Sequence, residues 1–170
     1  WQGMALQLAQ NEIVFKTTLD ECAEAFSKVV TWDLWEVLKK GLYEEIDIIQ
    51  PALVAVQIAL AKLWQNYGIN PDIVVGHSMG EVSAAYIAGN ITLDEAAEII
   101  CNRSLLMKTK SGQGEMLATD LTFEEATVIT DKTFNEVSIA VVNSPNSIVL
   151  SGNPDKLKQI LTQLEEEGRF

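Results

Sequence analysis

The stretch VVGHSMGEVSAAYIAG, Val74 to Gly89, decides the fold. It begins with β-branched residues, passes through a serine that has a glycine two residues before and after it, and continues as an alanine-rich pattern. We expect a short strand over Asp72–Val75, a sharp turn, and a helix over Glu81–Ala88. A buried strand that runs directly into a helix is typical of α/β folds.

A serine in this position can act as a nucleophile. Small residues at Gly76 and Gly80 let the chain turn sharply, so that Ser78 Oγ is exposed at the helix N-terminus. The Met79 amide, aided by the helix dipole, would then point at a carbonyl oxygen that acquires negative charge. Ser78 could instead simply cap the helix, but strand, turn and helix agree, and we favour the nucleophile.

The chain holds one histidine, His77, directly beside the serine. Neighbouring side chains at a sharp turn point in different directions, and a general base must lie about 3 Å from its proton donor. We therefore expect His77 to be a packed, hydrogen-bonded histidine beneath the turn, at the border of the substrate site. A serine hydroxyl is a weak nucleophile without a base, so the base is either unusual or outside this chain.

Composition narrows the function classes. At 170 residues, with 48% hydrophobic residues, the chain has room for one globular domain or a larger lobe carrying a small one. A net charge of -12 argues against nucleic acid and anionic membranes as partners. The apolar runs are too short for a membrane span and no leader opens the chain, so we expect a cytoplasmic protein. Cys22 and Cys101 lack the spacing of a metal site or disulfide framework.

The sequence pattern predicts mostly helices in the first two thirds of the chain. A long buried helix is expected with Pro51 in its first turn and Gly68 at its end. A further helix opens with a capping box from Thr92 to Glu95 and runs towards Lys108. Together with the serine turn, these elements predict a hydrolase-like α/β subdomain over residues 1–113.

The glycine-rich segment SGQGE, Ser111 to Glu115, marks an internal boundary. Beyond it the order strand, helix, strand, strand, helix predicts a ferredoxin-like subdomain over residues 114–170 that lacks its last strand. The expected elements are a strand over Met116–Thr119, a helix capped by Thr122 and Glu125, strands over Val137–Val142 and Ile148–Leu150, and a helix over Pro154–Gly168.

Five segments resemble one family. QPALVAVQIALAKLW, GHSMGEVSAAYIAG, TLDEAAEIICNRSLLM, SGQGEML and VVNSPNSIVLSG are similar, in this order, to the acyltransferase domain of modular and iterative polyketide synthases. More distantly, they resemble the malonyl-CoA:acyl carrier protein transacylase of fatty-acid synthesis. The resemblance extends over essentially the whole chain.

The resemblance implies roles for individual residues. Ser78 matches the serine that takes the acyl group as an ester, and the Met79 amide matches half of the oxyanion hole. Arg103 matches the arginine that holds the free carboxylate of a malonyl or methylmalonyl unit, for which a guanidinium offers a planar fork. From spacing alone, Arg103 would be a surface arginine paired with a helix glutamate. Gln50 and Asn143 match residues that border the site, although capping and turn roles also explain them.

The implied reaction uses acyl-CoA and the phosphopantetheine thiol of an acyl carrier protein, within a synthase of neighbouring domains, and needs no metal or bound cofactor. In the family, a second oxyanion amide precedes the position of Trp1, and the catalytic histidine follows the next strand after Phe170. We therefore expect this chain alone to show little turnover. EEIDIIQ resembles the methylmalonyl version of its segment, but Met79 replaces the glutamine that often accompanies it, and we favour malonyl.

Two other classes of function are open. A serine esterase or lipase would share the turn, but it would need an HGGG-like loop and, after Ser78, an acid and a histidine. A patatin-like Ser/Asp lipase would need an Asp-Gly-Gly or Asp-Gly-Ala segment, which the chain lacks. The second alternative to an acyltransferase is a non-catalytic, truncated lobe that serves as a scaffold.

Overall fold

The computed structural model describes residues 3, 5–41 and 44–169. The chain forms two compact units, Trp1–Thr109 and Lys110–Phe170. We call them unit 1 and unit 2 and describe each by itself. The predicted subdomain boundary, after residue 113, falls between the last helix of unit 1 and the first strand of unit 2.

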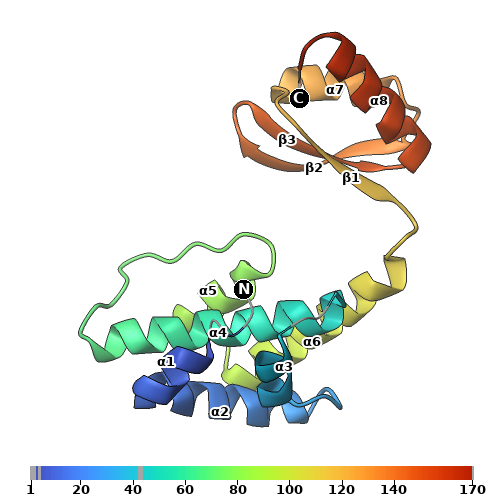
Figure 1. The fold of residues 1–170 in the computed structure, drawn as a ribbon. Coiled ribbons are helices and arrows are strands. Elements are labelled where there is room, and N and C mark those ends of the chain that lie inside the picture. Colours follow the sequence, from blue (N-terminus) through green and yellow to red (C-terminus); the bar gives the residue numbers. More distant parts are fainter. Residues whose placement is uncertain (1–2, 4, 42–43, 170) are drawn as a thin grey trace. The chain divides into compact units, whose positions relative to one another are not determined.

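Unit 1 consists of helices (Figure 1). They are α1 (Leu6–Asn11), α2 (Ile13–Ser27), α3 (Leu34–Lys40), α4 (Ile46–Asn66), α5 (Gly80–Ile87) and α6 (Leu93–Lys110). Helix α4 packs against both α2 and α5. The serine turn therefore precedes a helix that is fixed to the centre of the unit.

Helix α4 forms the middle of the core of unit 1. Its residues Val54, Ile58 and Ala59 are fully buried. An 18-residue stretch of this 21-residue helix has a mean hydropathy of 1.6, so by length and composition alone the helix could cross a membrane. This corrects the expectation that every apolar run is too short to do so. The helix packs against α2 and α5, and 44% of the apolar stretch is buried inside the structure.

Helix α4 begins at Ile46, so Pro51 lies in its second turn and not in the first turn, as predicted from the sequence. The amides of Ile48 and Ile49 both donate to the Glu45 carbonyl at 3.0 Å, so a complete turn forms ahead of the proline. Pro51 then lacks only the N–H that would have bonded the carbonyl of Asp47. The early start places the residues before Pro51 on the helix rather than in a loop.

The predicted strand over Asp72–Val75 is wrong. Residues 70–77 have no regular secondary structure, and they form the long green arc between α4 and α5 in Figure 1. Ile73 and Val75 are 89% and 94% exposed. A strand needs a neighbouring strand for its backbone hydrogen bonds, and the described residues of unit 1 include no strand.

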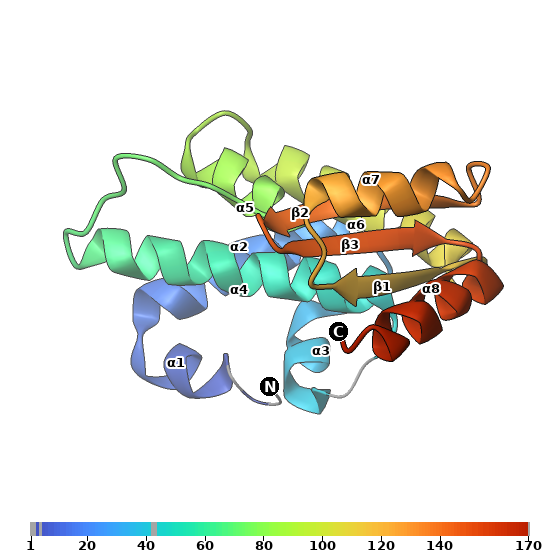
Figure 2. The same cartoon turned by 90° about the horizontal axis from the view of Figure 1, so that it is seen from above.

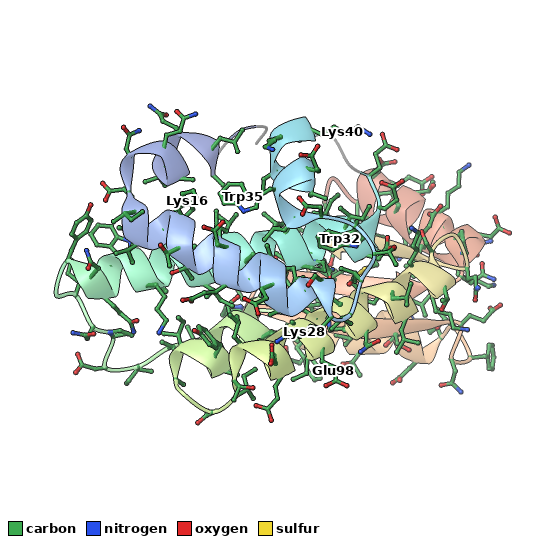
Figure 3. The ribbon with its side chains drawn as sticks, turned by 90° about the horizontal axis from the view of Figure 1, so that it is seen from below. Lys16, Lys28, Trp32, Trp35, Lys40 and Glu98 are labelled. Carbon is green, nitrogen blue, oxygen red and sulfur yellow. The ribbon has the colours of Figure 1, made fainter. Side chains whose placement is uncertain are left out.

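The predicted capping box of α6 is confirmed. The Thr92 amide donates to Glu95 Oε2 at 2.7 Å, and the Glu95 amide donates to Thr92 Oγ1 at 3.2 Å. The hydrogen bonds that the Thr92 amide and hydroxyl donate to the Glu95 carboxylate lower the pKa of this group. The start of α6 is also tied to the end of α2, because Nζ of Lys28, a residue labelled in Figure 3, lies 2.8 and 3.0 Å from the two carboxylate oxygens of Asp94.

Unit 2 has the predicted order of elements. They are β1 (Glu115–Thr119), α7 (Phe123–Asp131), β2 (Val137–Ser144), β3 (Ser147–Gly152) and α8 (Pro154–Glu166). The sheet is antiparallel, with β3 between β1 and β2 (Figure 2). Helices α7 and α8 cover one face of it (Figure 1), and Ile148 and Leu150 of β3 point into the resulting core.

Candidate active site

The turn at Ser78 is sharp even though no strand precedes it. Ser78 has φ = 54°, in the left-handed region that a non-glycine residue rarely adopts. A Cβ on Gly76 would lie 2.2 Å from the Gly80 carbonyl oxygen, so this position accepts only glycine. The Glu81 amide donates to the Ser78 carbonyl at 3.1 Å and starts α5. The serine is therefore solvent-exposed at the N-terminal end of α5.

The side chain of Arg103 links those of Ser78 and Gln50. The guanidinium of Arg103 on α6 donates from Nη2 to Ser78 Oγ at 3.1 Å. From Nη1 it donates to Oε1 of Gln50 on α4 at 2.8 Å. Both Arg103 and Gln50 are half-buried. The structure therefore brings together three of the predicted site residues within unit 1.

Arg103 has no carboxylate partner among the described residues, although the chain contains twenty-four acidic residues. Its two hydrogen-bond acceptors, an amide oxygen and a hydroxyl, are both neutral. The surface ion pair with a helix glutamate, which spacing alone favours, is absent here. A guanidinium has five N–H donors, so a planar anion beside Ser78 could still receive several hydrogen bonds.

The backbone amide of Met79 is available as a donor. The next three amides, those of Gly80, Glu81 and Val82, donate to the carbonyls of His77, Ser78 and Met79. Among the described residues, the Met79 amide has no hydrogen-bond partner. An unpaired amide adjacent to a nucleophile, at the positive end of a helix, suits a developing oxyanion.

His77 does not pack as expected. It is solvent-exposed, and none of the described residues hydrogen-bonds its side chain. It lines a largely apolar cavity of about 740 Å³ between α4, α5 and residues 69–77. Residues 70–77 do not form the predicted strand, so they do not hold His77 against the core of unit 1. Among the described residues, the hydrogen-bond partner of Ser78 Oγ is Arg103, which is a donor and cannot accept the serine proton. The described residues therefore place no general base beside the serine.

The hydrogen bonds of this cluster do not involve Asn143 or the two cysteines. Asn143 is an exposed residue of β2 in unit 2, and its place at the border of the site stays a prediction. Cys22 and Cys101 are buried, and burial raises the pKa of each thiol to about 12. The described residues contain no group of histidine, cysteine and acidic side chains that could hold a metal ion.

The structure contains a second polar contact between α4 and α6, which the sequence analysis did not predict. Lys108 Nζ lies 2.8 Å from Oδ1 and 3.0 Å from Oδ2 of Asp47. The aspartate side chain is 18% exposed and that of the lysine 44%. Asp47 stands one helical turn before Gln50, but Lys108 stands five residues after Arg103, a separation that does not place two residues on the same face of a helix.

Comparison with known proteins decides the family. The model of the acyl transferase domain family matches residues 1–170. The chain belongs to the acyl transferase domain family. It is 42% identical over 173 residues to the spectinabilin polyketide synthase system protein NorA' of Streptomyces orinoci, and 39% identical over 173 residues to polyketide synthase GfsB of Streptomyces halstedii. Each alignment covers 99% of this chain but only 5% and 3% of those relatives.

Solved structures support the same assignment. The acyltransferase domain from module 8 of the salinomycin polyketide synthase matches with a TM-score of 0.93 and 33% identity, over all of this chain and 41% of that one. An acyl carrier protein S-malonyltransferase from Vibrio cholerae matches with a TM-score of 0.85 and 32% identity, over 99% of this chain and 57% of that one. These matches confirm the predicted α/β acyltransferase fold, and the chain spans about half or less of each.

Proposed function

We propose that this chain carries the serine of a polyketide synthase acyltransferase that moves an extender unit from coenzyme A to an acyl carrier protein. The observation that supports this most is the contact between the Arg103 guanidinium and Ser78 Oγ. A cation without a carboxylate partner, held beside a nucleophile, favours an acyl group that itself ends in a carboxylate. Malonyl and methylmalonyl units fit this description, and we favour malonyl.

The reaction runs in two half-reactions. Ser78 Oγ attacks the thioester carbonyl while its proton passes to a base, and the Met79 amide receives the oxyanion. The C–S bond then breaks, and coenzyme A leaves as a thiol with the proton. In the second half-reaction, the phosphopantetheine thiol of the carrier protein attacks the serine ester, and Ser78 leaves as the alcohol.

Arg103 fixes the orientation of the acyl group in both half-reactions. Its contact with Gln50 sets the plane of the guanidinium, and the remaining N–H donors face the distal carboxylate of the substrate. Because Ser78 Oγ accepts a hydrogen bond from Arg103, its own hydrogen remains free for transfer to a base. No step of this sequence requires a metal or a bound cofactor.

We further propose that the base is a histidine outside these 170 residues, because the described part of the chain places none beside Ser78 Oγ. On this proposal, the 170 residues alone are not appreciably acylated. The acidic chain offers no long-range attraction to an acidic carrier protein. Within a cytoplasmic synthase, tethering of neighbouring domains can supply an effective concentration on the order of mM instead.

The direct test is to incubate the protein, as its gene encodes it, with malonyl-CoA and to locate the acyl group by peptide mass spectrometry. We expect a malonyl ester on Ser78 that disappears when a phosphopantetheine thiol is added. Ser78→Ala should show no ester while keeping the far-UV circular dichroism spectrum.

Two results would contradict the proposal. Release of free malonate, without transfer to the thiol, would indicate an esterase. Unmodified Ser78 in the gene product, together with binding of the carrier protein, would indicate a non-catalytic scaffold.

A further inference from the structure

Two polar contacts join α4 and α6 next to each other. Gln50 of α4 accepts from Arg103 of α6, and Asp47 of α4 binds Lys108 of α6. Along α4 the aspartate precedes the glutamine, whereas along α6 the lysine follows the arginine. Helices α4 and α6 therefore run antiparallel here. The Asp47–Lys108 ion pair lies next to the Gln50–Arg103 hydrogen bond along both helices.

Asp47 is a potential competitor for Arg103. Residues three apart on a helix have Cβ atoms about 5–6 Å apart, so the Asp47 carboxylate lies within one turn of the amide that contacts the guanidinium. Its Oδ1 is buried, where charges are weakly screened. An unpaired carboxylate in such a position attracts the nearest cation, and arginine binds carboxylates in a two-pronged fashion.

Lys108 lies beside both oxygens of this carboxylate, but it hydrogen-bonds only Oδ2, and the buried Oδ1 has no hydrogen-bond donor among the described residues. The Lys108 ammonium lies within 3.0 Å of each oxygen, in an ion pair whose acidic member is mostly buried. We propose that Lys108 neutralises Asp47 and thereby keeps Arg103 free for the carboxylate of the incoming acyl group. This makes Lys108 a positioning residue that sets substrate selectivity, and the inference rests on the proposed role of Arg103.

The test compares the rates at which Ser78 is acylated by malonyl-CoA and by acetyl-CoA, in the protein as its gene encodes it. In Lys108→Met, the freed Asp47 competes for Arg103. We expect the malonyl-to-acetyl ratio of kcat/KM to fall about tenfold or more, as coupling between close charges allows. The loss should lie in the KM for malonyl-CoA, with acetyl transfer unchanged.

Rescue variants separate neutralisation from simple tethering of the helices. Asp47→Asn combined with Lys108→Met removes both charges and should restore the ratio, and Lys108→Arg should keep it. If the contact acts only as a tether, the double variant loses selectivity as fully as Lys108→Met does, which would overturn the proposal. Lys108→Gln gives the same test if the methionine variant does not fold.

The chain offers a matched control at the other end of α6. Lys28 and Asp94 form an ion pair with the same distances, 2.8 and 3.0 Å, but at the first turn of the helix. Lys28→Met should leave the malonyl-to-acetyl ratio unchanged. An equal fall in Lys28→Met and Lys108→Met would mean that α6 stability, and not Asp47, controls selectivity.

The outcome also distinguishes this inference from the proposed function. If the unsubstituted protein is not acylated on Ser78, both are wrong. If it is acylated and Arg103→Ala changes the malonyl-to-acetyl ratio while Lys108→Met and Lys108→Gln do not, only the role of Lys108 is wrong.

Discussion

The chain contains two arginines, and their surroundings differ. Arg169, after α8 in unit 2, is bound by acids: Nη1 lies 2.7 Å from Glu125 Oε1, and Nε lies 3.4 Å from Asp120 Oδ1. Arg103, in unit 1, makes hydrogen bonds to the neutral oxygens of Gln50 and Ser78 and to no other described residue. One guanidinium is used to hold a small subdomain together, and the other has no counter-ion among the residues that the structure describes.

The difference between the two arginines shows that an ion pair that could stabilise the fold is formed at Arg169 and not at Arg103. Glu125 also completes the capping box of α7 with Thr122, so Arg169 extends a local structure that is already formed. A chain with net charge -12 could pair every arginine in the same way. That Arg103 is held beside the strained serine instead is what we expect of a binding group, because such costs are tolerated at functional sites.

The largest effect should come from Arg103→Ala. Hydrogen bonds to charged groups are each worth about 1.5–3 kcal/mol, so the malonyl-to-acetyl ratio of kcat/KM should fall about 10- to 100-fold. Arg103→Lys keeps the charge but loses the planar fork, and it should give an intermediate ratio. Equal losses with malonyl-CoA and acetyl-CoA would show that Arg103 does not contact the carboxylate.

Gly76→Ala should disrupt the surroundings of Ser78 and Arg103 together. The new Cβ would overlap the Gly80 carbonyl, and overpacking of this kind costs about 1–3 kcal/mol. All four tryptophans of the sequence lie in unit 1, so urea unfolding followed by tryptophan fluorescence reports on it. Gly80→Ala, whose Cβ would meet open space, should cost less stability, and the reverse order would contradict the turn geometry.

Arg169→Ala should lower the stability of unit 2 without changing substrate selectivity, whereas Arg103→Ala should change substrate selectivity. It removes the ion pairs to Glu125 and Asp120, so unit 2 should become less resistant to unfolding, as measured by hydrogen exchange of the β3 amides. The malonyl-to-acetyl ratio should stay unchanged. A shift in that ratio would mean that the two arginines are not independent.

The smallest effect is a pH dependence of unit 2. Hydrogen bonds from Arg169 and Thr122 lower the pKa of Glu125 from 4.5 to about 2. Because the folded pKa is the lower one, this interaction stabilises unit 2 above pH 4.5, and its contribution is lost as the pH falls towards 2. An acid titration followed by amide NMR should show this, and in Glu125→Gln the loss between these pH values should be smaller.

Local signals made much of this fold predictable. The capping boxes at Thr92 and Thr122 set where α6 and α7 begin, because both partners of each box lie within four residues. The order of strands and helices in unit 2 followed from alternation and turn residues for the same reason. The turn at Ser78 was predictable because its glycines adjoin it in the sequence.

Most of the wrong or missing predictions concern interactions between distant residues, and the position of Pro51 is the exception. The β-type pattern of residues 72–75 needs a partner strand, and none lies among the described residues of unit 1. Pro51 was placed in the first turn of α4, although a full turn precedes it. Contacts from α6 to α4 cannot be derived from periodicity, and only the family resemblance pointed to Arg103, while nothing pointed to Lys108.

The central claim is that Ser78 is acylated by a carboxyl-bearing group that Arg103 selects. The most direct measurement offers the protein, as its gene encodes it, equal concentrations of malonyl-CoA and acetyl-CoA, and identifies the group on the Ser78 peptide by mass spectrometry. We predict malonyl on Ser78 in large excess over acetyl, and an excess at least about tenfold smaller in Arg103→Ala. Equal amounts of the two groups on Ser78, or an acyl group on another residue, would contradict the claim.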